Sequence, residues 1–292
     1  MSNKNLKFIS IIFLVLIGIL ALKLYLPKFS PVKSVYLEKI KGINIQSIQT
    51  IGIKKGSQTI KFNKENNIWK IKNEKADADK VQSLLSTLMA TTIPELVAQT
   101  DKRYKEFELT NDLATVIKLD NKLTVYTGKY NGAGIYARLD GSPMVYVLKN
   151  TSAIPTTSSE WYDLTIIALD QSKVTKLSFE DNDTPMIIIK KNDKWISEKT
   201  NKEAKKDKVN SILSILSKLT AQSLLEESKK DSYPASPDLT LVIEYEGKSN
   251  TLEFFKGESD YLVKREADSG QFIVSEYAVS SLISAPEEIF TP

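Results

Sequence analysis

Short runs of alternating apolar and polar residues fill most of the chain after residue 47. The first pair of runs covers residues 48–53 and 59–64, and a second pair covers residues 174–179 and 185–190. Such alternation, with a polar turn between the runs, is typical of β-strands that bury one face. Further runs of the same kind follow in each half, so we expect β-strands to dominate the chain.

A different spacing of apolar residues follows each pair of runs. The apolar positions recur at i, i+3, i+4 and i+7, at Val81, Leu84, Leu85 and Leu88 and again at Val209, Ile212, Leu213 and Leu216. This spacing predicts one amphipathic helix in each half. Asp79 and Asp207 lie near the predicted helix starts, where a carboxylate interacts favourably with free amides and the helix dipole.

The two halves of the chain match each other in order and spacing. The strand patterns align at an offset of 126 residues, which also places Trp69 on Trp195, and the helices align at an offset of 128. A self-match of this kind indicates a duplicated unit. We therefore expect an α+β protein of two tandem repeats, residues 47–170 and 171–292. Each repeat is expected to hold a mostly antiparallel sheet with one packed amphipathic helix.

Three tryptophans stand out as candidate structural anchors. Trp69 and Trp195 each follow a pair of strands and precede a helix, so we expect each ring to pack between sheet and helix. The alternative is a pair of aromatic binding platforms, one in each half. Trp161 begins the phrase WYDLTIIALD, which joins one half to the next.

The start of the chain has a near-continuous apolar pattern. Residues 8–26 are long enough to cross a bilayer as a helix, and Lys4 and Lys7 precede them within the tail 1–7. We expect an uncleaved transmembrane signal anchor, followed by a linker over residues 27–46. A cleaved signal peptide and a buried core helix are the alternatives. The basic start favours a body outside the cytoplasm, at the cell membrane.

Composition removes several kinds of chemistry. The chain has neither Cys nor His, so it cannot hold a disulfide, a Ser-His-Asp or Cys-His centre, or a zinc site of the usual type. The 40 basic and 36 acidic residues give the chain a net charge of +4. Three of the basic residues lie before residue 27, so the rest of the chain is nearly neutral. A nearly neutral body argues against nucleic acid as a partner.

Several polar motifs have a structural interpretation that we prefer. The glycine-rich run 128–134 precedes a strand and not a helix, so a hairpin turn is favoured over a phosphate-binding loop. The acidic run 181–183 lacks the Gly and Glu of a calcium loop. The basic run 199–208 is expected in a solvated loop and helix start, with an anionic polymer or lipid headgroups as the alternative.

Neighbouring carboxylates do not by themselves form a catalytic pair. They occur at Asp77 with Asp79, Glu226 with Glu227, and Glu287 with Glu288. Hydrolysis by two carboxylates requires groups that converge from different elements, so we expect these residues to act as helix caps or surface groups. The sequence therefore predicts no catalytic residue, no cofactor and no metal site.

The chain resembles the bacterial family called domain of unknown function 4340. The resemblance rests on a strand ending in WKI, the run ADADKVQSLLSTL, the loop KRYKEFEL, the series YTGK, GIYARL and VYVL, and the WYDLTIIALD phrase. It implies a membrane-anchored envelope protein with no assigned activity, of a kind that accompanies ABC transporters or gliding-type machinery. The second half departs from the pattern, with AKKD and SYPASPDL in place of ADAD and RYKEFEL.

These observations favour a non-enzymatic binding or scaffolding protein of the cell envelope. Its expected partners are the membrane, through the N-terminal helix, and an envelope protein of an ABC-transporter-like or gliding-type complex. The alternative is an envelope hydrolase that uses carboxylates in a cleft between the two halves. A third hypothesis is a spacer that holds a partner at a set distance from the membrane.

Overall fold

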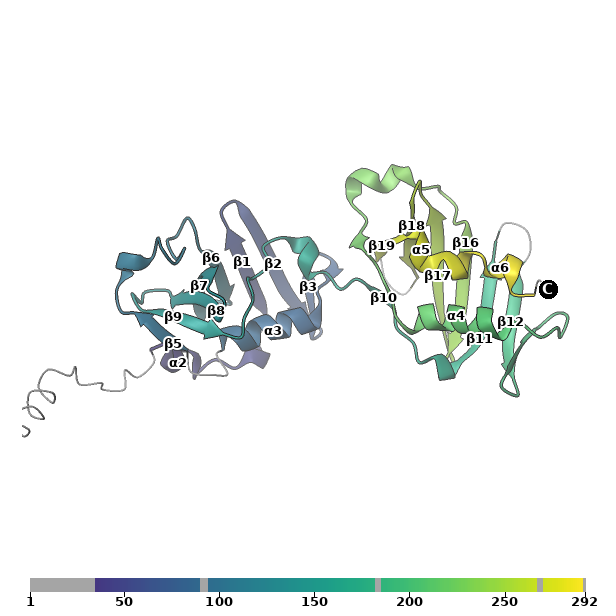
Figure 1. Cartoon of the computed structure of the whole chain (residues 1–292), viewed down its shortest axis with the longest axis horizontal. Coiled ribbons are helices and arrows are strands. Elements are labelled where there is room, and N and C mark those ends of the chain that lie inside the picture. The colour runs from purple at the N-terminus through teal and green to yellow at the C-terminus, as the bar shows by residue number, and fades with distance from the viewer. Residues whose placement is uncertain (1–34, 90–93, 182–184, 267–269, 291–292) are drawn as a thin grey trace, which may run out of the picture. The chain divides into compact units, whose positions relative to one another are not determined.

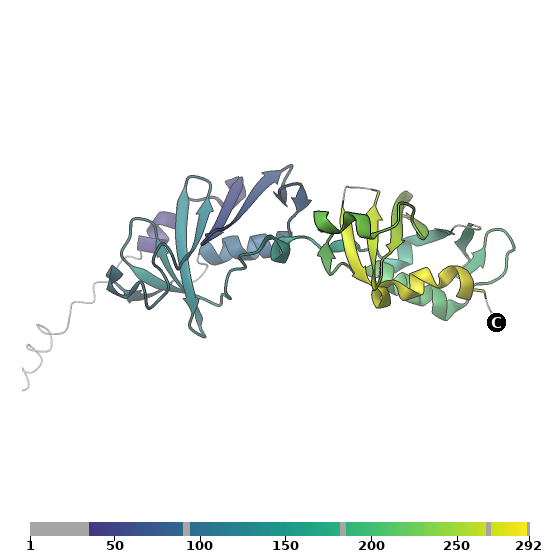
Figure 2. The same ribbon diagram turned by 90° about the horizontal axis from the view of Figure 1, so that it is seen from above.

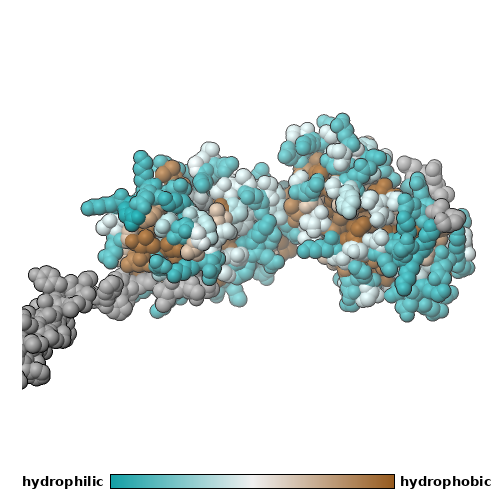
Figure 3. Space-filling model, in the orientation of Figure 1, coloured by the Kyte–Doolittle hydropathy of each residue, from teal (hydrophilic) through white to brown (hydrophobic). Residues whose placement is uncertain are grey.

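Strands make up most of the described chain. The computed structural model describes residues 35–89, 94–181, 185–266 and 270–290, and within them the strands form sheets of nine, two and eight strands (Figure 1). Hydrophilic residues cover much of the surface that Figure 3 shows, with smaller hydrophobic areas between them.

The first sheet has the order β4-β3-β2-β1-β6-β7-β8-β9-β5. Its strands are β1 (Thr50–Lys55), β2 (Gln58–Glu65), β3 (Ile68–Ile71), β4 (Glu74–Lys75), β5 (Glu95–Ala98), β6 (Thr115–Leu119), β7 (Leu123–Tyr130), β8 (Gly134–Leu139) and β9 (Val145–Lys149). The hairpins β1-β2-β3-β4 and β6-β7-β8-β9 are antiparallel, and so is the pairing of the short edge strand β5 with β9. Their inward side chains are apolar, as the alternation predicts.

Helix α3 (Ala78–Leu88) runs alongside this sheet in both ribbon views (Figures 1 and 2). Its predicted apolar face is confirmed, because Val81, Leu84, Leu85 and Leu88 are all at most 5% exposed. The short helix α2 (Val35–Ile40) packs at its end: the Tyr36 hydroxyl donates to the carbonyl of Leu88 over 2.8 Å. This bond satisfies a carbonyl that the helix leaves unpaired at its C-terminus.

The second large sheet has the order β13-β12-β11-β16-β17-β18-β19-β15. Its strands are β11 (Val174–Glu180), β12 (Met186–Lys191), β13 (Lys194–Ser197), β15 (Ser223–Leu224), β16 (Leu239–Tyr245), β17 (Lys248–Lys256), β18 (Asp260–Arg265) and β19 (Gln271–Ser275). It is antiparallel and shares the strand order of the first sheet apart from β4. One cluster of buried apolar residues between Ile166 and Ile289 forms its core.

Three helices accompany this sheet: α4 (Lys206–Ser217), α5 (Glu276–Ile283) and α6 (Ala285–Glu288). The predicted face of α4 is confirmed, since Val209, Ile212, Leu213 and Leu216 are buried. The remaining elements are the small sheet of β10 (Thr165–Ile167) with β14 (Leu219–Thr220) and five 3-10 turns. These are η1 (Ile45–Ser47), η2 (Asp101–Arg103), η3 (Ser158–Trp161), η4 (Gln171–Lys173) and η5 (Glu227–Ser232).

The similar phrases NNIWKI and NDKWIS both begin with a tight turn. Asn66 and Asn67, and likewise Asn192 and Asp193, have φ between +49° and +65°. Two consecutive residues with positive φ are typical of the type I′ turn, whose twist suits a β-hairpin, and Asn and Asp tolerate that conformation. The turn therefore accounts for the polar residues that precede each tryptophan.

The expected fold class is wrong in three respects. The strands form three sheets and not two, because part of the joining phrase (β10) pairs with a strand after α4. Three helices, and not one, accompany the second large sheet. No helix in the described ranges is long and apolar enough to cross a bilayer. The segment 8–26, expected to be a transmembrane helix, lies outside the described residues, as do the tail and most of the linker.

Candidate functional site

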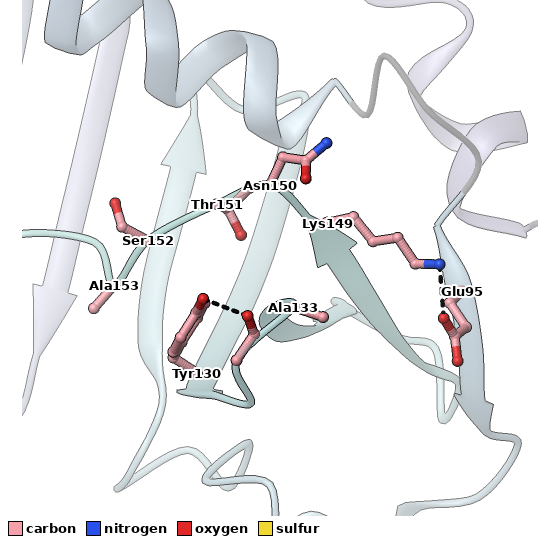
Figure 4. Close-up of a pocket in the computed structure, with 9 residues that line it drawn as sticks. Glu95, Tyr130, Ala133, Lys149, Asn150, Thr151, Ser152 and Ala153 are labelled. Atoms are coloured by element: carbon pink, nitrogen blue, oxygen red, sulfur yellow. Dashed lines mark hydrogen bonds and ion pairs between the residues drawn. The ribbon is translucent and has the colours of Figure 1, made fainter.

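A polar pocket lies at one end of the first sheet. It has a volume of about 870 Å³ and is open to solvent. Figure 4 shows the side chains that line it. Its lining comes from the end of β7, the β7-β8 turn, the end of β9 with the chain directly after it, and the start of β5. The lining residues are Glu95, Tyr130, Gly132, Ala133, Lys149, Asn150, Thr151, Ser152 and Ala153.

The β7-β8 turn is held by its own hydrogen bonds. The side-chain oxygen of Asn131 accepts from the amides of Ala133 and Gly134, both at 3.0 Å. Gly132 has a φ of +93°, a conformation that L side chains rarely adopt. The predicted hairpin at residues 128–134 is confirmed, and its tight turn forms one wall of the pocket.

The opposite wall is fixed to the sheet through Thr151. Its hydroxyl donates to the carbonyl of Leu148 over 2.7 Å and accepts from the amide of Ile135 at 3.2 Å. The amide of Asn150 donates to the carbonyl of Ala133 over 3.1 Å, which ties this wall to the turn. Both walls therefore have a backbone geometry set before any ligand binds.

Tyr130 presents an aromatic surface at this pocket. Its side chain is 52% exposed, and its hydroxyl donates to the carbonyl of Gly132 over 2.6 Å. The dashed line at Tyr130 in Figure 4 marks this bond, which limits rotation of the side chain. A ring that is held in place and exposed offers an apolar face for stacking at little further cost in side-chain entropy.

One ion pair supplies the charge at the pocket. Lys149 Nζ lies 2.9 Å from a carboxylate oxygen of Glu95, and both side chains are about half exposed. Among the described residues that line the pocket, Glu95 is the only carboxylate, and Asn150 and Ser152 add neutral polar groups. Among the described residues, no group of three or more acidic side chains is arranged to hold a metal ion. The pocket is thus equipped for hydrogen bonding and aromatic contact.

The sequence-selected tryptophans do not line this pocket. Trp69 lies in β3 and is 8% exposed, whereas Trp195 lies in β13 and packs, partly buried, against the core of the second sheet. Trp161 ends η3 at 2% exposure. Its ring meets Phe62 edge to face at 5.2 Å, and its indole N–H donates to the carbonyl of Pro155.

The acidic residues near the helix starts are also remote from the pocket. Asp79 lies in the first turn of α3, but the carboxylate that accepts from the free amides is that of Asp77, with Asp79 N at 3.1 Å and Lys80 N at 3.0 Å. Asp207 lies in the first turn of α4, where Lys205 at the cap position makes no side-chain cap bond. The acidic run 181–183 lies partly outside the described residues.

Sequence reasoning missed the pocket itself. The glycine-rich run pointed to the turn, but Tyr130 was hidden within a strand pattern, and residues 150–153 follow β9 without any motif. The lining is complete only because β5, which carries Glu95, pairs with β9. That pairing connects residues about fifty positions apart, which no local pattern encodes.

Fold and site together define a mainly antiparallel β protein with a solvent-open pocket at one end of its first sheet. The family described as domain of unknown function (DUF4340) matches residues 69–238, more than half of the chain, and the chain belongs to this family. Neither a curated protein nor a solved structure is similar enough to match it.

Proposed function

We propose that this chain is a non-enzymatic binding or scaffolding protein of the cell envelope, and that the Tyr130 pocket contacts its ligand or partner. The observation that carries the proposal is the pocket's construction. Two walls fixed by backbone hydrogen bonds surround an exposed, restrained aromatic ring and several neutral polar groups. Pre-formed concave sites of this kind favour recognition, because little ordering remains to be done on binding.

The rival proposal, a carboxylate hydrolase, has less support at this pocket. Glycoside hydrolysis by the usual mechanism needs two carboxylates on opposite sides of the bond, about 5–10 Å apart. In the part of the lining that the structure describes, one carboxylate is present, Glu95, and Lys149 pairs with it. Binding is therefore the function that the pocket geometry favours.

We further propose that residues 8–26 attach the chain to the cell membrane, with the body outside the cytoplasm. The support is the apolar run and its basic start. For the protein partner, we propose a component of an ABC-transporter-like or gliding-type complex. This proposal rests on the family resemblance alone. Extraction of membranes with alkaline carbonate checks attachment, since a chain lacking residues 1–26 should be released where the full chain stays.

The binding proposal is tested by affinity capture from gently solubilised membranes. The full chain is compared with Tyr130→Ala and with Tyr277→Ala, a matched variant because Tyr277 is 91% exposed and does not line the pocket. We expect a reproducible partner to be recovered with the wild type and with Tyr277→Ala, and reduced at least severalfold with Tyr130→Ala. Equal recovery with both variants would mean that the partner does not bind at the Tyr130 pocket. Turnover of an envelope polymer that Glu95→Gln abolishes would favour the hydrolase.

A further inference from the structure

The lining of the Tyr130 pocket places apolar and polar groups side by side. Apolar surface comes from the Tyr130 ring and from the methyl groups of Ala133 and Ala153. Polar groups come from Asn150, from Ser152 and from the ion pair described above (Figure 4). A ligand that matches this lining must itself present C–H surface and hydrogen-bonding groups close together.

The lining carries no net charge. Lys149 and Glu95 are the charged side chains among the lining residues that the structure describes, and they pair at 2.9 Å. A phosphate or an acidic segment would have to compete with Glu95 for the ammonium group. A cationic ligand would have to compete with Lys149 for the carboxylate in the same way. The charge balance therefore favours a neutral ligand.

Two polar side chains of the lining are free to bind a ligand. The Asn150 amide and the Ser152 hydroxyl are exposed and have no hydrogen-bond partner within the described parts of the chain. The backbone of Asn150 is fixed, because its N–H donates to the carbonyl of Ala133 over 3.1 Å. Both side chains can donate and accept hydrogen bonds, as can the hydroxyl groups of a ligand.

The Tyr130 ring offers a flat surface for stacking. It is 52% exposed, and the 2.6 Å bond from its hydroxyl to the Gly132 carbonyl limits its rotation. The face of an aromatic ring is electron-rich and attracts polarised C–H groups. One face of a sugar ring can present C–H groups alone, while its hydroxyls project from the edge. Such a ring would meet both the Tyr130 ring and the free polar groups.

The second large sheet shows that this lining does not follow from the strand order alone. Its hairpin β17-β18 has the place of β7-β8 in that order, but its turn follows Lys256 where the first turn follows Tyr130. Directly after β19 the chain enters α5 at Glu276, whereas after β9 it continues without a helix through Ala153. The aromatic ring and the free amide are thus properties of these residues and not of the topology.

We propose that the Tyr130 pocket binds a neutral saccharide, with a sugar ring stacked on Tyr130 and its hydroxyls bonded to Asn150 and Ser152. The inference rests on the proposed binding function and names the class of ligand. The volume of about 870 Å³ lies within the usual range for ligand pockets, about 300–1,000 Å³, and the open side lets a longer glycan extend beyond it. A peptide fits less well, because apart from Tyr130 the described lining has no apolar side chain larger than alanine.

The test measures the binding of two neutral hexasaccharides, cellohexaose and chitohexaose, to the full chain. The chain is held in neutral detergent micelles whose headgroups are not sugars, and dissociation constants come from NMR titrations of the saccharide signals. We expect at least one hexasaccharide to bind the wild type. Its dissociation constant should rise about tenfold in Tyr130→Ala. It should change less than twofold in Tyr277→Ala, whose side chain is 91% exposed and does not line the pocket.

Two further variants separate stacking from hydrogen bonding. Tyr130→Phe keeps the ring and should raise the dissociation constant less than about threefold, so a loss as large as that of Tyr130→Ala would contradict stacking. Asn150→Gly removes the amide and suits the φ of +57° at this position. It should weaken binding about threefold or more, as is usual for a lost hydrogen bond, and unchanged binding would contradict the assigned contact.

Failure of both hexasaccharides to bind the wild type would overturn the inference, as would equal losses in Tyr130→Ala and Tyr277→Ala. Affinity capture separates this result from the proposed function. If Tyr130→Ala loses a captured protein and neither saccharide binds, the pocket binds a protein, and only the saccharide inference falls. If a saccharide binds through Tyr130 and capture is equal for both variants, the saccharide inference stands and the protein partner binds elsewhere.

Discussion

At the scale of single residues, Gly134 allows β8 to approach β9 at the pocket. A Cβ placed on Gly134 would lie 2.0 Å from the carbonyl oxygen of Leu148, which is backbone and cannot swing away. Gly134→Ala should therefore lower the free energy of unfolding by about 2 kcal/mol or more. Gly42→Ala is the control, because nothing lies within 4 Å of its Cβ, and it should change stability by less than about 0.5 kcal/mol. Urea denaturation compares the two; equal stabilities would mean that the hairpin relaxes freely.

Tyr233 gives a pH dependence with a defined sign. Burial, and then its hydrogen bond to Asp260 at 2.8 Å, raises the pKa of Tyr233 to about 12 from its usual 10. The protonated form is favoured in the folded chain, so its stabilising contribution is complete below pH 10 and is lost as the pH rises towards 12. Tyr233→Phe should be less stable than the wild type at pH 8, and this difference should shrink between pH 10 and 12. Unfolding curves at several pH values measure it, and a difference that grows with pH would contradict the assignment.

At the scale of elements, two neighbouring carboxylates at the start of α3 have different roles. Asp77 accepts from two free amides at the helix start, whereas Asp79 only lies in the first turn. Asp77→Ala should lower the free energy of unfolding by about 1 kcal/mol. Asp79→Ala, which removes a dipole interaction only, should cost about 0.5 kcal/mol or less. Thermal unfolding of both variants checks the order, and a larger loss for Asp79→Ala would contradict it.

Periodicity predicted the elements better than it predicted their ends. The buried faces of α3 and α4 follow directly from the spacing of Val81, Leu84 and Leu85 and of their counterparts, because a helix must bury one stripe. The capping residue could not be chosen between Asp77 and Asp79 in the same way. Both are acidic and two positions apart, and the bond from the Asp77 amide to the Trp161 carbonyl, which holds Asp77 at the helix start, joins residues far apart in the chain.

At the scale of the whole molecule, distant pairings account for what the sequence did not predict. The hairpins were predicted because each is local, with a polar turn between alternating strands. The pairing of β5 with β9, which completes the pocket, and that of β10 with β14, which makes the third sheet, join residues far apart in the chain. Each pairing includes at least one strand of two to four residues, which is too short for a periodic signal. The pocket was therefore unpredictable for the same reason as the third sheet.

The core of the second large sheet leads to a prediction about folding. Every buried member of its main cluster lies between Ile166 and Ile289, and it includes side chains from β11, α4, β16 and α5. A fragment of residues 163–292 should therefore retain this core and fold by itself. We expect cooperative urea unfolding with a slope of about 1–3 kcal/mol per molar urea, as is usual for a small domain.

A shorter fragment, residues 163–238, provides the control for that experiment. It ends before β16 and so lacks the buried residues from Leu239 onward, which supply about half of the cluster. It should show no cooperative transition, because β11 then loses its neighbour and α4 loses its contact with α5. If the longer fragment also unfolds without cooperativity, the second sheet depends on residues before 163, and the buried cluster is not sufficient to hold it.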